Sequence, residues 1–390
     1  MELPIPCEER LQTLCAKRRL TISIPRELAT EDTRVPLTPQ GVELLVAQGH
    51  TVKVEKGVGE AARFDDSRYA EAGATVVTTH KAAFDAEVVL KTTLPTVKEV
   101  SLMQKKASLI CSISQLRRSK DDVQALAAKK CNVLALDFLT DGKSHQSLLR
   151  RSLSEIEGSM AITTAASLLQ QTNEGKGIVI GGVTGVPPTE IVVVGSDLTA
   201  FSIAKIAQAF GSTVKIFDSD MLHLQQINER LPVRVFTSNI HPQAFNKALQ
   251  SADVVIGTRS PSPEAFFVPA ESIKQLKRHA IVIDLNINFG GRFEISHATT
   301  IDKPTFIYGD TICHCLPDIT VLASHTASIV VSDFVAPTIG RIAIGGGLLS
   351  SIREDRVLAS ATAMLQGVTT NRYLAQTYDT DFCDIDLLSF

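Results

Sequence analysis

The stretch Gly175–Ala200 reads GKGIVIGGVTGVPPTEIVVVGSDLTA and decides the fold. Its β-branched run, Ile191–Val194, has the composition of a strand buried on both faces, and it leads directly into a glycine and a helical pattern. A strand, a glycine turn and a helix in this order are typical of the loop that binds the pyrophosphate of a dinucleotide. Gly195 can make the tight turn, and Ala200 is small enough for the helix to pack closely on the strand.

One position of this loop departs from the G-x-G-x-x-G/A pattern. After Gly195 and Ser196 comes Asp197, where the second glycine of the pattern lets the backbone approach the pyrophosphate. Two unit charges about 5 Å apart repel by roughly 3 kcal/mol at an effective dielectric near 20. We therefore expect weakened binding, less so if the carboxylate points into solvent. Asp218 ends the next expected strand, where a carboxylate would bind the ribose hydroxyls of NAD and disfavour a 2′-phosphate. The alternative is an α/β scaffold that has lost its ligand.

Composition limits the remaining classes of function. The chain has 390 residues, 44% hydrophobic and 21% charged, which suits a soluble protein of two domains. A net charge of -3 gives no reason to expect nucleic acid or an anionic membrane as partner. Pro337 and Arg341 interrupt the most apolar stretch, and the N-terminal segment lacks an apolar signal core, so neither a membrane span nor secretion is expected. The seven cysteines indicate reduced thiols in a cytoplasm. Cys313-His314-Cys315 is too compact for its side chains to meet on one ion, and no metal site is expected.

Strand and helix patterns alternate through most of the chain, which predicts an α/β fold. We expect two doubly wound, Rossmann-like domains with a cleft between them, one comprising residues 1–150 with 319–390 and the other residues 151–318. Helices are predicted from Thr38-Pro39 to Gly49, over Glu155–Gln171 and over Thr326–Gly345. The expected strands are Leu20–Ile24, Thr51–Glu55, Glu87–Lys91, Ser108–Ser112, Val133–Asp137, Ile191–Val194, Val214–Asp218, Asp253–Gly257, Ala280–Asp284 and Thr305–Tyr308.

Several segments together resemble the alanine dehydrogenases and, related to them, the nucleotide-binding subunit of proton-translocating transhydrogenase. The resemblance runs from about residue 20 to the C-terminus, and the segments GGVTGVPPTEIVVVG and TRVPLTPQGVELLVAQGH are its most specific parts. The other matching segments are IPRE (Ile24–Glu27), VVLK (Val88–Lys91), SLSEIEG (Ser152–Gly158), FDSD (Phe217–Asp220) and VIDLNINFGG (Val282–Gly291).

The resemblance implies roles for three residues and a cofactor, NAD (NADH). Arg34 would bind the substrate carboxylate, a task that suits the planar guanidinium. Lys91, at the end of an apolar strand, would polarise the substrate carbonyl or carbinolamine oxygen, and Ser154 would contact the nucleotide phosphates. The alternatives are a surface ion pair for Arg34, a solvated lysine, and an exposed serine before a helix, where Ser152 and Glu155 would form a capping box.

Four positions depart from the family pattern. The catalytic histidine is replaced by Ser114 or Gln115, depending on the register, and neither is a general base near neutral pH. Asn288 stands in place of the catalytic aspartate, His325 in place of an arginine, and Asp318 in place of an asparagine in the nucleotide site. The histidines nearest in sequence, His80 and His145, are expected in loops.

Three functions therefore stay open. The first is NAD-dependent oxidative deamination of a small L-amino acid such as alanine to a 2-oxo acid (pyruvate) and ammonia, with altered or weakened catalysis. The second is a catalytically impaired, nucleotide-binding or regulatory relative. The third is a transhydrogenase-like NAD(H)-binding subunit. By resemblance we also expect a homo-oligomer, either a hexamer or a dimer.

Overall fold

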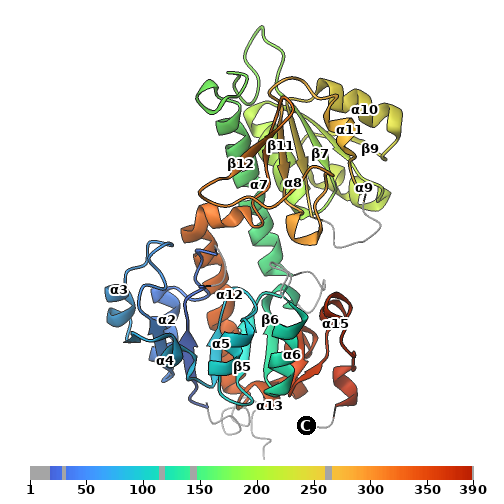
Figure 1. Cartoon of the computed structure of the whole chain (residues 1–390). Coiled ribbons are helices and arrows are strands. Elements are labelled where there is room, and N and C mark those ends of the chain that lie inside the picture. Colours follow the sequence, from blue (N-terminus) through green and yellow to red (C-terminus); the bar gives the residue numbers. More distant parts are fainter. Residues whose placement is uncertain (1–17, 29–31, 114–118, 141–146, 260–265, 389–390) are drawn as a thin grey trace, which may run out of the picture. The chain divides into compact units, whose positions relative to one another are not determined.

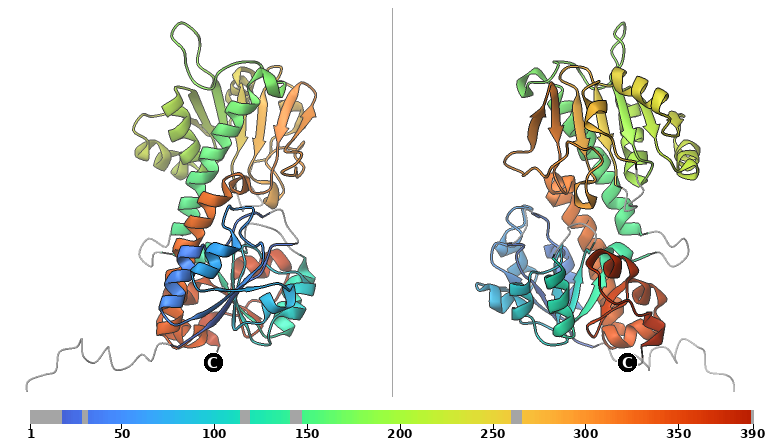
Figure 2. Two further views of the ribbon diagram at one scale, coloured as in Figure 1. Left: turned by 90° about the vertical axis from the view of Figure 1, so that its left-hand side faces the viewer. Right: turned by 45° about the vertical axis from the view of Figure 1, so that its right-hand side comes forward.

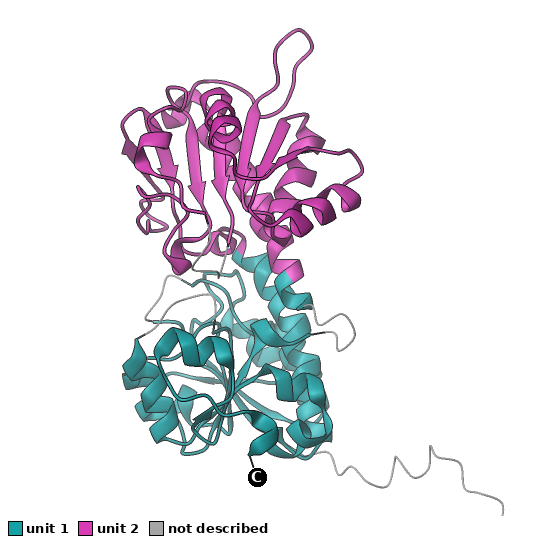
Figure 3. Ribbon diagram, turned by 90° about the vertical axis from the view of Figure 1, so that its right-hand side faces the viewer, with its two compact units in different colours: residues 1–150, 324–390 teal, residues 151–323 magenta. Residues whose placement is uncertain are grey.

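The computed structural model describes residues 18–28, 32–113, 119–140, 147–259 and 266–388 (Figure 1). These residues form two compact units, coloured separately in Figure 3. Unit 1 contains the described residues up to Arg150 together with those from Ser324 onward, and unit 2 is Arg151–Ala323. The second crossing between the units thus falls at Ala323, where the sequence predicted residue 318. The expected cleft between the domains stays a prediction.

Unit 1 is built on an eight-stranded sheet in the order β15-β14-β6-β5-β4-β1-β2-β3. The six strands from β1 to β6 are parallel, and a C-terminal hairpin adds β14 and β15 antiparallel at one edge. The strands are β1 (Thr21–Ile24), β2 (Thr51–Glu55), β3 (Thr75–Val77), β4 (Val88–Leu90), β5 (Ser108–Cys111), β6 (Asn132–Ala135), β14 (Thr362–Leu365) and β15 (Val368–Thr369).

Helices lie on both faces of this sheet because the strand order reverses after β3 (Figure 2). Right-handed crossovers place helices on opposite faces when the chain moves in opposite directions along a sheet. One face packs through Val100, Val123 and Leu374 of α5, α6 and α15. On the other, α2 and α12 are joined by a hydrogen bond of 3.0 Å between the hydroxyls of Thr38 and Ser332. The helices are α2 (Pro39–Ala47), α3 (Asp66–Glu71), α4 (His80–Phe84), α5 (Val97–Leu102), α6 (Lys120–Ala128), α12 (Ser324–Ile344), α13 (Leu348–Glu354), α14 (Arg356–Ala361) and α15 (Arg372–Tyr378), with 3₁₀ turns at Leu136–Phe138 and Ile385–Leu387.

Unit 2 contains a seven-stranded sheet in the order β12-β13-β11-β10-β7-β8-β9, in which only the edge strand β12 is antiparallel. Alternate residues of β7 enter two separate cores: Ile191 and Val193 face α7, α8 and α9, whereas Val192 and Val194 face α10 and α11. Burial on both faces explains why the strand reads as an unbroken apolar run. The elements are β7 (Glu190–Val194), β8 (Thr213–Phe217), β9 (Phe236–Ser238), β10 (Val254–Gly257), β11 (Ile281–Asp284), β12 (Thr305–Tyr308), β13 (Thr311–His314), α7 (Leu148–Leu168), α8 (Leu198–Phe210), α9 (Met221–Arg230), α10 (Pro242–Ser251) and α11 (Ala270–Ile273), with 3₁₀ turns at Gln171–Asn173, Ile287–Phe289 and Ile319–Ala323.

The predicted ends of α2 are confirmed, and the predicted start of α7 is wrong. Thr38 caps α2 by accepting from the backbone N–H of Gly41, Pro39 is the first helical residue, and Gly49 follows with φ +89°. Helix α7 begins before Ser152, because the hydroxyl of Ser147 accepts from the N–H of Arg150 and starts the helix there. Ser152 therefore lies inside α7, and the expected capping box is not formed.

The long C-terminal helix was predicted within two residues at its start and one at its end, as α12, Ser324–Ile344. The stretch Ile319–Ile344 is long and apolar enough to span a membrane by length and composition. Its most apolar window is 56% buried against the protein, as in the core helix of a folded domain. Five described strands, β3, β9, β13, β14 and β15, were not predicted.

Candidate functional site

The glycine turn of unit 2 lies where the strand order reverses. β7 is flanked by β8 on one side and by β10 on the other, and ligands of open α/β sheets bind at the carboxyl ends of such strands. Gly195 follows β7 with φ +118°, and a Cβ on it would lie 2.2 Å from Oγ1 of Thr258, which follows β10. Only glycine fits this position, as the sequence predicted.

Asp197 directs its carboxylate back onto the helix that follows. It is the N-cap of α8, and its Oδ1 accepts from the backbone N–H of Ala200 at 3.0 Å. A helix N-terminus binds anions because its first N–H groups are unpaired and the helix dipole is positive there. The chain's own carboxylate thus takes up part of the capacity of α8 to bind a phosphate, and the solvent-pointing side chain that would have reduced the repulsion is not observed.

Asp218 and Ser196 adjoin each other beside the turn. The Ser196 hydroxyl donates to Oδ2 of Asp218 at 2.6 Å, and Oδ1 accepts from the backbone N–H of Asp220 at 3.2 Å. The carboxylate is half-buried directly after β8 and remains able to accept further hydrogen bonds. This is the position and chemistry expected for recognition of ribose hydroxyls.

Ser154 is completely buried within α7, so the alternative of an exposed serine before a helix is wrong. Its hydroxyl has no hydrogen-bond partner among the described residues. About one turn later, Glu157 accepts from the Thr199 hydroxyl at 2.6 Å and pairs with Arg259 at 2.8 Å, which joins α7 to the first turn of α8. The turn of α7 that follows Ser154 therefore contacts the first turn of α8 through Glu157.

Asn288 and Asp318, from separate segments of unit 2, lie close together. Nδ2 of Asn288 donates to the carbonyl oxygen of Pro317 at 3.0 Å. Asp318 accepts from the backbone N–H and the hydroxyl of Thr320 at 3.0 and 2.6 Å. The Asn288 bond joins the two loops, whereas the Asp318 bonds fix the turn that follows Asp318 in its own segment.

Lys91 in unit 1 also lies at a reversal of strand order, directly after β4 where β4 adjoins β1. Its side chain is 0% exposed, and Nζ lies 2.8 Å from Oε2 of Glu27 and 3.0 Å from Oε1 of Glu99. Burial alone would lower the pKa of Lys91, but the ion pairs with the two carboxylates outweigh burial and leave the pKa raised. The alternative of a solvated lysine is therefore wrong, and the cation is held in its charged form.

The carboxylates that hold Lys91 are themselves held in place. Glu27 accepts from the backbone N–H and hydroxyl of Thr92, at 2.7 and 2.8 Å. Burial opposes ionisation of Glu99, but Lys91 and hydrogen bonds from Thr96 lower its pKa. His80 adjoins this cluster: Nε2 lies 3.7 Å from Oε1 of Glu99. The sequence placed His80 in a loop, whereas it is the first residue of α4.

Arg34 is buried and already bound to a carboxylate. Its Nε donates to Oδ1 of Asp32 at 2.8 Å and its Nη2 binds Oδ2, which is the two-pronged geometry a substrate carboxylate would otherwise adopt. The alternative of an ion pair is confirmed for Arg34, but the pair with Asp32 is buried and does not lie on the surface. A substrate carboxylate would have to share this guanidinium with Asp32 or replace it.

Ser114, Gln115 and His145 lie outside the described residues. The segment before Ser114 is held by Asp137, whose carboxylate accepts from the hydroxyl of Ser112 and, at 2.9 Å, from the backbone N–H of Ile113. His325 at the start of α12 is exposed, stacks on Phe64 at 4.5 Å and bonds the carbonyl oxygen of Ala62 through Nδ1 at 2.8 Å.

The compact Cys313-His314-Cys315 segment is ill suited to bind a metal. Cys313 and His314 are successive residues of β13, so their side chains leave opposite faces of the strand. Burial raises the pKa of each thiol to about 12 and lowers the pKa of His314 to about 4. Neutral thiols are poor ligands, and no group of three or more candidate ligands occurs in the described part of the chain.

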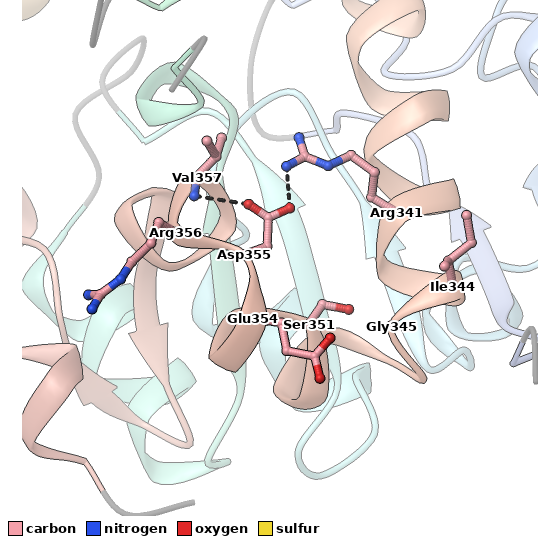
Figure 4. A pocket seen from close by; sticks show the side chains of 8 residues that line it. All are labelled: Arg341, Ile344, Gly345, Ser351, Glu354, Asp355, Arg356 and Val357. Atoms are coloured by element: carbon pink, nitrogen blue, oxygen red, sulfur yellow. Dashed lines mark hydrogen bonds and ion pairs between the residues drawn. The ribbon is translucent and has the colours of Figure 1, made fainter. Parts of the chain in front are cut away.

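A separate hollow of about 460 Å³ lies at the end of α12 in unit 1 (Figure 4). Arg341 and Asp355 form an ion pair across it, and Asp355 also accepts from the N–H of Val357 at 3.0 Å. Neither Arg34 nor Lys91 lines it, and Arg341 and Asp355, two of its four charged residues, already neutralise each other. We therefore consider two candidate sites, one at Lys91 in unit 1 and one at the Gly195 turn in unit 2.

The sequence did not identify Glu27, Glu99 or Arg292. Glu27 and Glu99 contact Lys91 only because β1, β4 and α5 meet in the fold. Arg292 follows β11, and its Nη2 lies 3.1 Å from the position of a Cβ on Gly195. Glu27 ends the matching segment IPRE and Glu99 forms a capping box with Thr96, but neither pattern indicates a contact with Lys91. Arg292 likewise gains its neighbour from a distant segment.

Comparison with known proteins agrees with this arrangement. The family models "Alanine dehydrogenase/PNT, N-terminal domain" and "Alanine dehydrogenase/PNT, C-terminal domain" match residues 23–156 and 161–372. A Staphylococcus aureus (strain USA300) protein named "Alanine dehydrogenase 2" is 30% identical over 371 residues, which cover 94% of this chain and 99% of the relative. A Staphylococcus haemolyticus (strain JCSC1435) protein named "Alanine dehydrogenase" is 28% identical over 375 residues, covering 94% and 98%.

Solved structures give the same result. An L-alanine dehydrogenase superposes with a TM-score of 0.81 and 26% identity, covering 92% of this chain and 99% of that one. A transhydrogenase from Sinorhizobium meliloti superposes with a TM-score of 0.74 and 20% identity, covering 90% and 99%, which shows a shared fold. The chain belongs to the alanine dehydrogenase/PNT family.

Proposed function

We propose that this chain binds NAD(H) in unit 2 and catalyses, at a reduced rate, the NAD-dependent oxidative deamination of a small L-amino acid such as alanine to a 2-oxo acid and ammonia. The observation that carries the proposal is the buried Lys91 cation at the carboxyl end of β4, held charged by Glu27 and Glu99. By its family and composition we also propose a cytoplasmic homo-oligomer.

Lys91 would stabilise negative charge on the substrate oxygen. A buried ammonium, fixed between two carboxylates at 2.8 and 3.0 Å, is already oriented and needs no reorganisation when charge develops on a neighbouring oxygen. Arg34 would bind the substrate carboxylate by exchanging one of its contacts with Asp32. The substrate ammonium must lose a proton before the imine forms, and water or the half-exposed His80 beside Glu99 is the proposed acceptor.

The residues around the Gly195 turn fit NAD in two respects and oppose it in one. The glycine leaves a cradle that a Cβ would fill, and Asp218, which follows β8, would accept hydrogen bonds from the ribose hydroxyls. Asp197 adds a negative charge at the N-terminus of α8. When bound, NAD would accept the hydride from the α-carbon of the amino acid.

A second candidate function is nucleotide binding without turnover. The Asp197 carboxylate at the α8 N-terminus and the asparagine at position 288 favour it, because both changes act against a working dehydrogenase. In this case the chain would hold NAD(H) as a sensor or as a non-catalytic member of an oligomer.

One pair of measurements separates the two candidates. NADH can be titrated by its own fluorescence without interference from indole, since the chain has no tryptophan. Alanine and NAD at alkaline pH, and pyruvate, ammonium and NADH in reverse, then report turnover. Saturable binding with turnover that disappears in Lys91→Met supports the dehydrogenase. Saturable binding without turnover in either direction supports the second candidate, and absence of binding contradicts both.

A further inference from the structure

A cation next to the Gly195 turn has no role in the function proposed above. Arg292 is only 4% exposed, and its backbone follows β11. Its Nε donates to the carbonyl oxygen of Thr258 at 2.8 Å and its Nη1 to that of Phe266 at 3.1 Å. Nη2 donates to no acceptor in the described part of the chain and lies 3.1 Å from the position of a Cβ on Gly195. Two bonds thus fix the guanidinium while one nitrogen adjoins the turn.

A buried hydroxyl, that of Thr258, also adjoins the Gly195 turn, from the end of another strand. Thr258 follows β10 and is 0% exposed, and its Oγ1 has no hydrogen-bond partner among the described residues. This oxygen lies 2.2 Å from the position of a Cβ on Gly195. An unpaired buried hydroxyl costs about 1–3 kcal/mol, so its retention beside a nucleotide turn indicates a partner that arrives with a ligand.

Arg292 also balances the charge that Asp197 introduces. Burial lowers the pKa of Arg292, and the negative charges of Asp218, Asp197 and Asp284 oppose that shift. Asp284 is engaged elsewhere, since it accepts from the backbone N–H groups of Arg292 and Asn286 at 2.7 and 2.8 Å. A guanidinium keeps its proton in proteins, so it remains a fixed positive charge near the two aspartates of the loop.

We propose that Arg292 and Thr258 form the phosphate subsite of this chain, where the guanidinium binds a pyrophosphate oxygen of the dinucleotide and offsets the repulsion from Asp197. The inference rests on the proposed binding of NAD(H) in unit 2. A guanidinium suits phosphate because its N–H groups form a planar fork. Binding by a side chain replaces part of the backbone N–H binding that Asp197 has taken over at α8.

The test compares three probes that differ in phosphate. Adenosine and ADP are titrated by calorimetry and NADH by fluorescence, all with the full chain. Arg292→Gln should weaken the binding of ADP and NADH by tenfold or more and leave the affinity for adenosine within twofold of the wild type. The affinities of Arg292→Lys for ADP and NADH should lie between those of the wild type and of Arg292→Gln. Thr258→Val, which keeps the shape and removes the hydroxyl, should weaken ADP about threefold or more.

The control is Arg278→Gln, an exposed arginine that precedes β11 and so lies at the opposite end of that strand from Arg292. It should leave all three affinities unchanged. Equal weakening of adenosine and ADP by Arg292→Gln would mean a general loss of structure and would overturn the subsite. If Arg292→Gln does not fold, the subsite is tested with Arg292→Lys and Thr258→Val instead. An unchanged affinity for ADP in both variants would overturn the subsite. A wild-type chain that binds none of the probes overturns the NAD(H) proposal as well.

Discussion

Replacement of Asp197 by glycine should tighten NADH binding by about tenfold or more. The carboxylate accepts from the N–H of Ala200 at 3.0 Å, so it stays at the helix terminus where a pyrophosphate would be bound. Charges about 5 Å apart repel by roughly 3 kcal/mol at an effective dielectric near 20. The contact proposed between Arg292 and the pyrophosphate would offset part of that repulsion. A net gain of about 1.4 kcal/mol corresponds to the tenfold change.

The assay is NADH fluorescence titration of the wild type and Asp197→Gly, each at two salt concentrations. The difference in affinity should shrink at high salt, because repulsion between partly exposed charges is screened. Asp220→Gly is a matched control: Asp220 caps α9 in the same way, accepting from the N–H of His223 at 3.0 Å. Glycine replaces an aspartate cap at a cost of only a few tenths of a kcal/mol, so both variants should fold. Equal dissociation constants for wild type and Asp197→Gly would refute the reasoning.

Three further predictions follow from the contacts. Lys91→Met should lower the free energy of unfolding by about 3–5 kcal/mol at pH 7, because it leaves Glu27 and Glu99 buried without a cation; denaturant melts that match the wild type would contradict the buried ion pairs. The pKa of Glu99 is lowered in the folded chain, so its contribution to stability is present above the unfolded pKa of about 4.5 and is lost as pH falls through the folded value. Glu99→Gln should therefore flatten the acid limb of a stability-versus-pH curve, and an unchanged limb would count against the Lys91–Glu99 pair. Asn288→Asp should raise any dehydrogenase rate by about tenfold or more, because it restores a charge and a proton-transfer group; a lower rate would mean that the hydrogen bond from the Asn288 amide to the carbonyl oxygen of Pro317 matters more.

The local geometry of the glycine turn could be predicted from the sequence. Gly195, Asp197 and Asp218 lie within one strand–helix–strand unit, and their positions follow from short-range geometry. The same holds for the cap of α2 at Thr38. Such features depend on neighbouring residues alone, so that periodicity and capping rules suffice.

Other features depended on choices that local rules do not settle. Ser147 and Ser152 both have the side chain of a helix cap, and Ser147 is the one used, so that Ser152 lies inside α7. The hairpin of β14 and β15 turns at Gln366 and Gly367, both with positive φ. Glutamine rarely adopts that conformation, so this two-residue turn lacks the Asn-Gly or Asp-Gly signal that would have predicted it.

The partners of the candidate catalytic groups could not be predicted either. Lys91 was expected to polarise the substrate oxygen, but the carboxylates that hold it come from the loop after β1 and from α5. Arg292 reaches the turn after β7 from the loop after β11. Contacts of this kind exist only after the strand order is fixed, and the charge state of the site depends on them.

Transfer of deuterium tests the central claim most directly. The chain, at a concentration comparable to that of NAD, is incubated at alkaline pH with L-alanine that carries deuterium on its α-carbon, and the reduced nucleotide is examined by mass spectrometry. We predict NADH that contains the deuterium from the wild type and none from Lys91→Met. Saturable NADH binding without any deuterated product from the wild type would contradict the dehydrogenase and leave nucleotide binding as the function.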